Sequence, residues 1–178
     1  MNDPERPLPE SYWVEPGHLL AGEHPGGSTD FETRKRLTAL LTAGFDTFLD
    51  LTPPDEYPPY QLILAEEARL LGIEATHLRF PIADFGLPTR PQMTEILDTI
   101  DAALAAGHKV YLHCRGGIGR TGTTVGCHLI RRGKSGAEAL RQLAEWWHAV
   151  PKSACYPHSP ETAAQVEFVR AWPERSES

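Results

Sequence analysis

The stretch from Lys109 to Gly122 constrains the fold more than any other part of the chain. It starts with the apolar run Val-Tyr-Leu, continues through a glycine-rich turn and ends where a helical pattern begins. Cys114 and Arg120 stand at the two ends of this turn, six positions apart. A turn of this length can curl until the thiol, the guanidinium and the backbone N–H groups between them face one centre. The stretch therefore predicts an anion-binding cradle between a strand and a helix N-terminus.

Strand-like and helix-like patterns alternate along most of the chain. We expect strands at 12–14, 18–21, 45–51, 73–80 and 109–113, and helices at 28–43, 60–71, 91–106, 120–132, 136–149 and 162–172, with Ser159 before Pro160 as the cap of the last helix. This alternation predicts an α/β fold with a central, mostly parallel sheet flanked by helices. Ligands of such sheets bind beyond the carboxyl ends of the strands, which is where Cys114 lies.

The length of 178 residues predicts one domain, over 11–173, with a flexible lead-in at 1–10 and a tail at 174–178. A formal net charge of −7 argues against nucleic acid as a partner. No apolar run approaches the roughly 18 residues of a membrane span, so we expect no membrane insertion. The N-terminus shows no signal peptide, and three cysteines are a sparse, odd set. We therefore expect a cytoplasmic protein without disulfides.

The chemistry of the turn assigns roles to its side chains. Helix N-termini and cations favour the thiolate form of a cysteine, so Cys114 is the expected nucleophile. Arg120 is expected to hold two phosphoryl oxygens as a fork. Thr121 is expected to donate its hydroxyl to the Cys114 sulfur, and His113 to organise the turn through hydrogen bonds. The expected phosphate-binding residues are Arg115, Gly116, Gly117, Ile118, Gly119 and Arg120. For Arg115 the sequence supports two roles equally: a source of positive potential at the rim of the cradle, or a solvated surface side chain.

The segment His113-Cys-Arg-Gly-Gly-Ile-Gly-Arg-Thr-Gly122 resembles the His-Cys-x5-Arg-Ser/Thr signature of the protein tyrosine phosphatase superfamily. The layout over residues 11–172 is similar to the compact dual-specificity branch, including the kinase-associated phosphatase group. The resemblance implies a cysteine-phosphatase fold, a phosphatase-like catalytic domain and a cysteinyl-phosphate mechanism with neither a metal nor another cofactor. It also implies a phosphorylated protein or peptide as substrate, and phosphate, sulfate or vanadate as active-site anions.

Cleavage of a phosphate ester at neutral pH needs a proton for the leaving oxygen. The family carries this acid as an aspartate on a mobile loop before the signature. Asp84 lies in such a loop, between Pro81 and Pro88, and is the expected acid, with Asp50 and Asp55 in reserve.

The larger tyrosine-specific members position the hydrolytic water with a Gln-Thr-Ala-x-Gln stretch. Here Glu161 stands at the first Gln position and Gln165 at the second. The sequence therefore does not assign a residue that positions the hydrolytic water, and Gln165 is equally a candidate for a structural helix residue.

The sequence is compatible with three other functions. One alternative is a phosphate-recognition module without turnover. A second is a phosphoinositide or inositol phosphate phosphatase, ranked lower because Arg115 is the one basic residue inside the turn. A third is thiosulfate or arsenate chemistry with Cys155 as a second thiol, whereas Cys127 is expected in the core. Whether phosphotyrosine or phosphoserine and phosphothreonine are preferred depends on the depth of the pocket.

Overall fold

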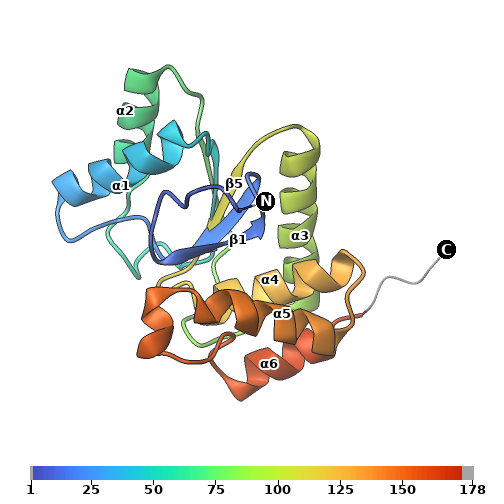
Figure 1. The fold of residues 1–178 in the computed structure, drawn as a ribbon. Coiled ribbons are helices and arrows are strands. Elements are labelled where there is room, and N and C mark those ends of the chain that lie inside the picture. The colour runs from blue at the N-terminus through green and yellow to red at the C-terminus, as the bar shows by residue number, and fades with distance from the viewer. Residues whose placement is uncertain (1, 174–178) are drawn as a thin grey trace.

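The computed structural model describes residues 2–173 and consists of one five-stranded sheet with helices on both faces (Figure 1). The strands are β1 (Ser11–Glu15), β2 (Leu19–Gly22), β3 (Thr47–Asp50), β4 (Thr76–Arg79) and β5 (Val110–His113). Their order across the sheet is β1-β2-β5-β3-β4. Only β1 runs antiparallel to its neighbour, and the other pairs are parallel. The prediction of a mostly parallel sheet is therefore confirmed.

The described part of the chain contains six α-helices and one 3-10 turn. They are α1 (Asp30–Thr42), α2 (Gln61–Leu71), α3 (Arg90–Ala105), α4 (Gly119–Arg131), α5 (Gly136–His148), the 3-10 turn η1 (Pro151–Ala154) and α6 (Ala163–Arg170). Hydroxyl side chains begin several of them: Thr29 caps α1, Thr89 caps α3, and Ser135 forms a capping box with Glu138 at α5. None of the helices within residues 2–173 is long and apolar enough to cross a membrane.

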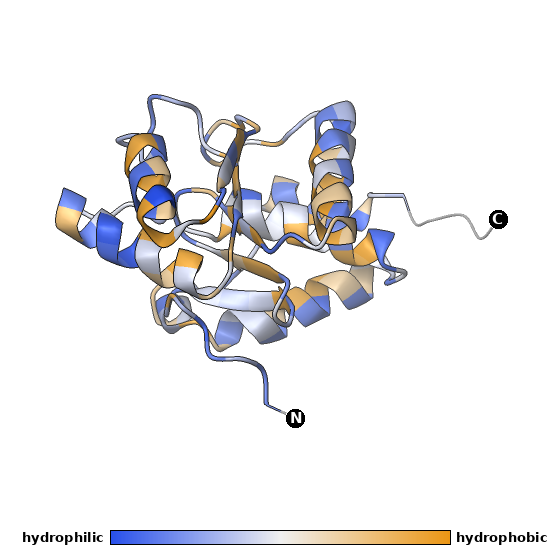
Figure 2. Ribbon diagram, turned by 90° about the horizontal axis from the view of Figure 1, so that it is seen from above, coloured by the Kyte–Doolittle hydropathy of each residue, from blue (hydrophilic) through white to orange (hydrophobic). Residues whose placement is uncertain are grey.

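The two faces of the sheet bury two separate hydrophobic clusters. In β5, Tyr111 packs in the cluster beneath α1 and α2, whereas Val110 and Leu112 pack in the cluster beneath α3 to α6. In β3, Phe48 and Leu49 divide in the same way, because successive side chains of a strand point to opposite faces. Hydrophobic and hydrophilic residues accordingly alternate along the flanking helices (Figure 2).

The innermost helix is α4, in which every residue from Gly119 to Ile130 is buried. It follows directly on the turn that contains Cys114. Gly126 lets α6 approach closely, because a Cβ at this position would lie only 2.7 Å from Val169 Cγ1. The packing of α4 thus fixes the position of its N-terminus at the carboxyl end of β5.

The prediction that Ser159 caps the last helix is wrong. Thr162 is the cap: its hydroxyl accepts from the Gln165 N–H at 3.1 Å, and α6 begins at Ala163. The Ser159 hydroxyl donates instead to the Ile118 carbonyl at 2.7 Å. Its hydrogen bond serves the Cys114–Arg120 turn and not the helix.

The lead-in at residues 2–10 contains no helix or strand, yet it contacts the domain. Leu8 is buried with the cluster beneath α1 and α2, and the Trp13 indole donates to the Pro4 carbonyl at 2.7 Å. Packing against the domain therefore begins before residue 11. The expected tail at 174–178 lies outside the described residues.

Candidate active site

One pocket at the carboxyl end of β5 brings together most of the side chains that the sequence predicts to be functional. Cys114 directly follows β5, Arg120 is the second residue of α4, and Asp84 comes from the loop between β4 and α3. All three line this pocket, together with the expected cradle residues Arg115, Gly116, Ile118 and Gly119. Gly117 is buried and does not line it.

Glu56 holds the guanidinium of Arg120. The Arg120 Nη1 donates to Glu56 Oε2 at 2.7 Å and the Nη2 to Oε1 at 2.6 Å, while Nη1 also donates to the Ile82 carbonyl at 2.9 Å. Burial favours the neutral form of Arg120, but Glu56 and the nearby Cys114 outweigh it and raise the pKa of this arginine. Glu56 was not predicted from the sequence, because nothing near it in the chain indicates contact with a residue 64 positions away.

The remaining edge of the guanidinium faces the candidate acid. Arg120 Nη2 donates to Asp84 Oδ1 at 3.1 Å, and within residues 2–173 the Nε–H donates to no protein atom. Nε and Nη2 form one side of the planar fork, the geometry that binds two oxygens of a phosphate. A phosphate on this edge would therefore replace Asp84 as the partner of Nη2 and leave Glu56 in place.

The backbone around Asp84 turns sharply. Gly86 N donates to the Ala83 carbonyl at 2.8 Å, and Phe85 has a φ of 59°, which is rare for a residue with a side chain. Asp84 Oδ1 accepts from the Phe85 N–H at 3.1 Å. Phe85 stands 60% exposed at the rim of the pocket. The turn thus places an acid and an aromatic side chain next to each other above the cradle.

The two reserve candidates for the acid do not line the pocket. Asp50 is fully buried and bound by His77 at 3.0 Å and by Arg79 at 3.2 Å. Although burial acts in the opposite direction, the hydrogen bonds from His77 and Thr52 hold the pKa of Asp50 well below its usual value. Asp55 is exposed. Asp84 is therefore the one candidate of the three in position to reach a bound phosphate ester.

His113 has the hydrogen bonds expected of a residue that organises the turn. Its Nδ1 lies 3.0 Å from the Cys114 carbonyl oxygen, which can only accept, so this nitrogen carries the proton. Burial lowers the pKa of His113 to about 4, so the ring is neutral at pH 7 and Nε2 accepts from the Tyr60 hydroxyl at 2.7 Å. Tyr60 was not predicted as part of the site, and its hydroxyl holds the imidazole ring of His113 next to Cys114.

The buried histidines predict a loss of stability in mild acid. Burial lowers the pKa of His113 to about 4 and that of His24 to about 3, against about 6.5 in an unfolded chain. Between about pH 6.5 and pH 4 the unfolded state therefore binds more protons than the folded state. The contribution of these histidines to the free energy of unfolding is complete above this window and is lost as the pH falls through it. Urea unfolding should show a free energy lower by about 2 kcal/mol per histidine at pH 5 than at pH 7. In His24→Asn the decrease should be about half as large, and an unchanged decrease would contradict this assignment.

The hydroxyl of Thr121 does not make the predicted bond. It is buried at the start of α4 and has no hydrogen-bond partner among the described residues, the Cys114 sulfur included. Its donor is thus uncommitted. The proposed contact with a leaving thiolate stays a prediction.

Gln165 is a structural residue and does not line the pocket. It is fully buried, its Oε1 accepts from the N–H groups of Glu161 and Thr162 at 3.1 Å each, and its Nε2 donates to the Gly86 carbonyl at 3.2 Å. It therefore joins the cap of α6 to the loop of Asp84. Glu161 does line the pocket, and burial together with the charge of Asp84 raises its pKa.

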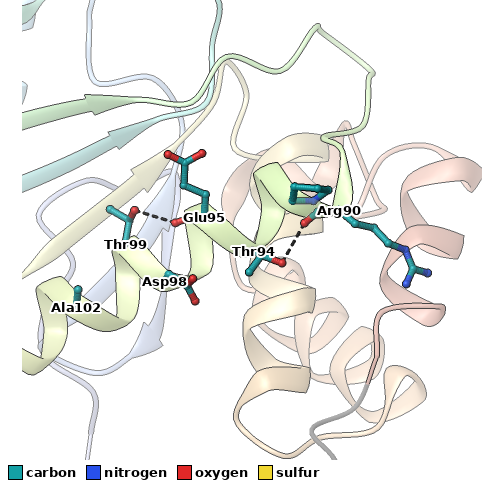
Figure 3. Close-up of a pocket in the computed structure, with 7 residues that line it drawn as sticks. Arg90, Thr94, Glu95, Asp98, Thr99 and Ala102 are labelled. Carbon is teal, nitrogen blue, oxygen red and sulfur yellow. Dashed lines mark hydrogen bonds between the residues drawn. The ribbon is translucent and has the colours of Figure 1, made fainter.

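A second hollow lies along the outer face of α3 and is unrelated to these residues (Figure 3). Its two threonines, Thr94 and Thr99, donate to the carbonyls of Arg90 and Glu95 in the same helix at 3.0 and 2.8 Å. The donors of both hydroxyls are thus already engaged within α3. Within residues 2–173, no three histidine, cysteine or acidic side chains are grouped to hold a metal ion.

The sheet order, the Cys114–Arg120 turn and the Asp84 loop define a compact protein of the protein tyrosine phosphatase superfamily. The crystal structure of Tk-PTP in its active form is similar, with a TM-score of 0.63 and 27% identity over 91% of this chain and 95% of that one. The kinase associated phosphatase shares the fold, with a TM-score of 0.69 and 19% identity over 90% of each chain.

A family model narrows this class. The model described as "Polymorphic toxin system, DSP-PTPase phosphatase" matches residues 23–134, and the chain belongs to that family. The Arabidopsis thaliana phosphatidylinositol 3,4,5-trisphosphate 3-phosphatase and protein-tyrosine-phosphatase PTEN1 is 31% identical over 98 residues, which are 54% of this chain and 24% of that protein. The Mus musculus protein tyrosine phosphatase domain-containing protein 1 is 25% identical over 127 residues, 67% of this chain and 17% of that protein. The chain thus spans about a quarter or less of the length of these two relatives.

Proposed function

We propose that this chain is a phosphomonoester hydrolase that acts on phosphorylated proteins or peptides through a cysteinyl-phosphate intermediate. The observation that supports this most is that Cys114, Arg120 and Asp84 come from three separate segments and line one pocket. A nucleophile, a phosphate-binding fork and a proton donor are what a two-step transfer requires. Membership of a phosphatase family supports the same conclusion.

The proposed reaction has two steps. In the first, the Cys114 thiolate attacks phosphorus, the bond to the leaving oxygen breaks, and Asp84 gives its proton to that oxygen. In the second, a water molecule attacks phosphorus, Asp84 takes one of its protons, and the sulfur–phosphorus bond breaks to restore the thiolate. Arg120 and the N–H groups of the turn stabilise the charge on the phosphoryl oxygens in both steps.

The charges of the pocket favour a substrate with a single phosphate. Three cations line it, Arg115, Arg120 and Lys152, and three carboxylates line it as well, Glu23, Asp84 and Glu161. A pocket balanced in this way gives no extra attraction to a headgroup with several phosphates.

The rim of the pocket favours an aromatic or peptide substrate. Tyr57, Phe85 and Tyr156 line the pocket, and the Arg115 guanidinium lies 5.4 Å from the centroid of the Tyr57 ring. We therefore place phosphotyrosine and other aryl phosphates first. We also propose a reducing, cytoplasmic location, because the described cysteines are free thiols and a thiolate nucleophile must stay reduced.

Phosphate release over a substrate panel tests this proposal. We expect kcat/KM for phosphotyrosyl peptides and aryl phosphates to exceed that for inositol polyphosphates and phosphoinositides by at least about tenfold, because only the latter bring additional charges to a balanced pocket. A higher rate on inositol substrates would favour the lipid or inositol phosphatase alternative. Phosphate binding without turnover of any substrate would instead indicate a recognition module.

A further inference from the structure

Other segments of the chain hold the carbonyl groups of the Cys114–Arg120 turn from outside. The His24 N–H donates to the Arg115 carbonyl at 3.0 Å. The Ser159 hydroxyl donates to the Ile118 carbonyl at 2.7 Å. Each of these bonds ties a carbonyl oxygen of the turn to a donor outside it. This matters because a carbonyl oxygen that pointed at a bound anion would repel it.

Lys152 supplies a third bond of this kind. Its Nζ donates to the Gly116 carbonyl at 3.1 Å, and the side chain is only 20% exposed. The backbone of Lys152 is held too, because its N–H donates to a Glu10 carboxylate oxygen at 2.9 Å. The 3-10 turn η1 therefore presents this ammonium group at a fixed position at the edge of the pocket.

The Gly116 carbonyl determines the direction of the next N–H group. In a trans peptide the C=O and the following N–H point in opposite directions, so a carbonyl turned to Lys152 turns the Gly117 N–H away from it. Gly117 has a φ of 74°, and a Cβ there would lie 2.6 Å from the Gly22 backbone. The backbone of the turn thus packs directly on the last residue of β2, and no side chain fits between the two segments.

We propose that Lys152 is a positioning residue for the phosphate cradle: it holds the Gly116 carbonyl and so aims the Gly117 N–H at a bound phosphate. The inference rests on the proposed function, because it assumes that phosphate binds in this turn.

The charge of Lys152 is largely compensated, which separates positioning from simple attraction. Its Nζ pairs with Glu23, and the other carboxylate oxygen of Glu23 accepts from Arg36 at 2.5 Å. If Lys152 acted only by charge, its removal would harm phosphate binding through the uncovered Glu23. Removing Glu23 as well would then restore the affinity.

Calorimetric titration with inorganic phosphate tests the proposal in a Cys114→Ser background, in which binding is measured without turnover. Lys152→Met should weaken phosphate binding by about tenfold, the effect of one lost hydrogen bond to a charged group. Lys152→Arg, which keeps a cationic donor, should stay within about threefold of the parent. The double variant Lys152→Met/Glu23→Gln should be as weak as Lys152→Met. Lys134→Met, which removes a lysine beyond the far end of α4, is the matched control and should bind phosphate normally.

The amide resonance of Gly117 in an NMR spectrum gives a readout that a merely structural role would not change. Phosphate should shift it strongly in the parent and weakly in a folded Lys152→Met variant. Equal phosphate affinity in parent and Lys152→Met, or affinity restored by Glu23→Gln, would overturn the inference and leave the proposed function standing. A native chain that binds phosphate but hydrolyses no ester would overturn hydrolysis, and the affinities would still decide the role of Lys152.

Discussion

Replacing Cys114 by serine is expected to lower kcat on an aryl phosphate by at least about 10⁴-fold, because a serine hydroxyl stays protonated where a thiolate is required. Serine is close to cysteine in size, and Cys114 is only 2% exposed, so the turn should keep its shape. Phosphate binding, measured by calorimetry, should therefore persist. Steady-state release of phosphate from the aryl ester measures the loss.

The matched control for Cys114 is Cys155→Ser. Cys155 is exposed and does not line the pocket, so turnover in this variant should equal that of the native chain. Undiminished turnover in Cys114→Ser would rule out a cysteinyl-phosphate intermediate. Trapping of a labelled phosphoenzyme by acid quench should succeed in the native chain and fail in the serine variant.

Replacing Asp84 by asparagine is expected to lower kcat by about 10²- to 10³-fold for phosphate esters with poor leaving groups. The asparagine keeps the shape of the side chain and an oxygen for Arg120, but it has no proton to give. The loss should shrink for nitrophenyl phosphate, because a good leaving group departs without protonation. A series of substituted phenyl phosphates, with log kcat plotted against the pKa of the leaving phenol, measures this difference.

The matched control for Asp84 is Asp55→Asn, which changes an exposed carboxylate outside the pocket and should leave kcat unchanged. A loss of the same size for all leaving groups would assign the carboxylate a role in binding and would remove it as the acid.

Glu56 and Lys152 show what sequence patterns did not reveal. Glu56 lies in a proline-rich loop and contacts Arg120 across 64 positions, and Lys152 contacts Gly116 across 36. In the sequence, both residues look like ordinary charged residues of the protein surface. Their contacts arise because separate loops converge at the carboxyl end of the parallel strands, and a local pattern carries no record of that convergence.

For Ser159 and Gln165, a local sequence pattern suggested a role that the tertiary structure does not support. The pattern at Ser159 predicted a helix cap, yet its hydroxyl binds the Ile118 carbonyl. Gln165 was a candidate for placing water, yet it is buried between the cap of α6 and Gly86. Both side chains found partners in a distant segment, and tertiary packing then outweighed the local preference.

The sequence by itself determined the local part of this protein: the alternation of strands and helices, and a strand–turn–helix with Cys114 and Arg120 at its ends. These features depend on hydrophobic periodicity, glycine and residue spacing, which act within a few residues of the chain. The tertiary structure alone decided that Asp84, rather than Asp50, reaches the pocket, and which groups hold the guanidinium and the carbonyls of the turn. Those choices depend on how distant segments pack, so the guanidinium of Arg120 at the end of the turn is oriented by Glu56, a residue outside the turn.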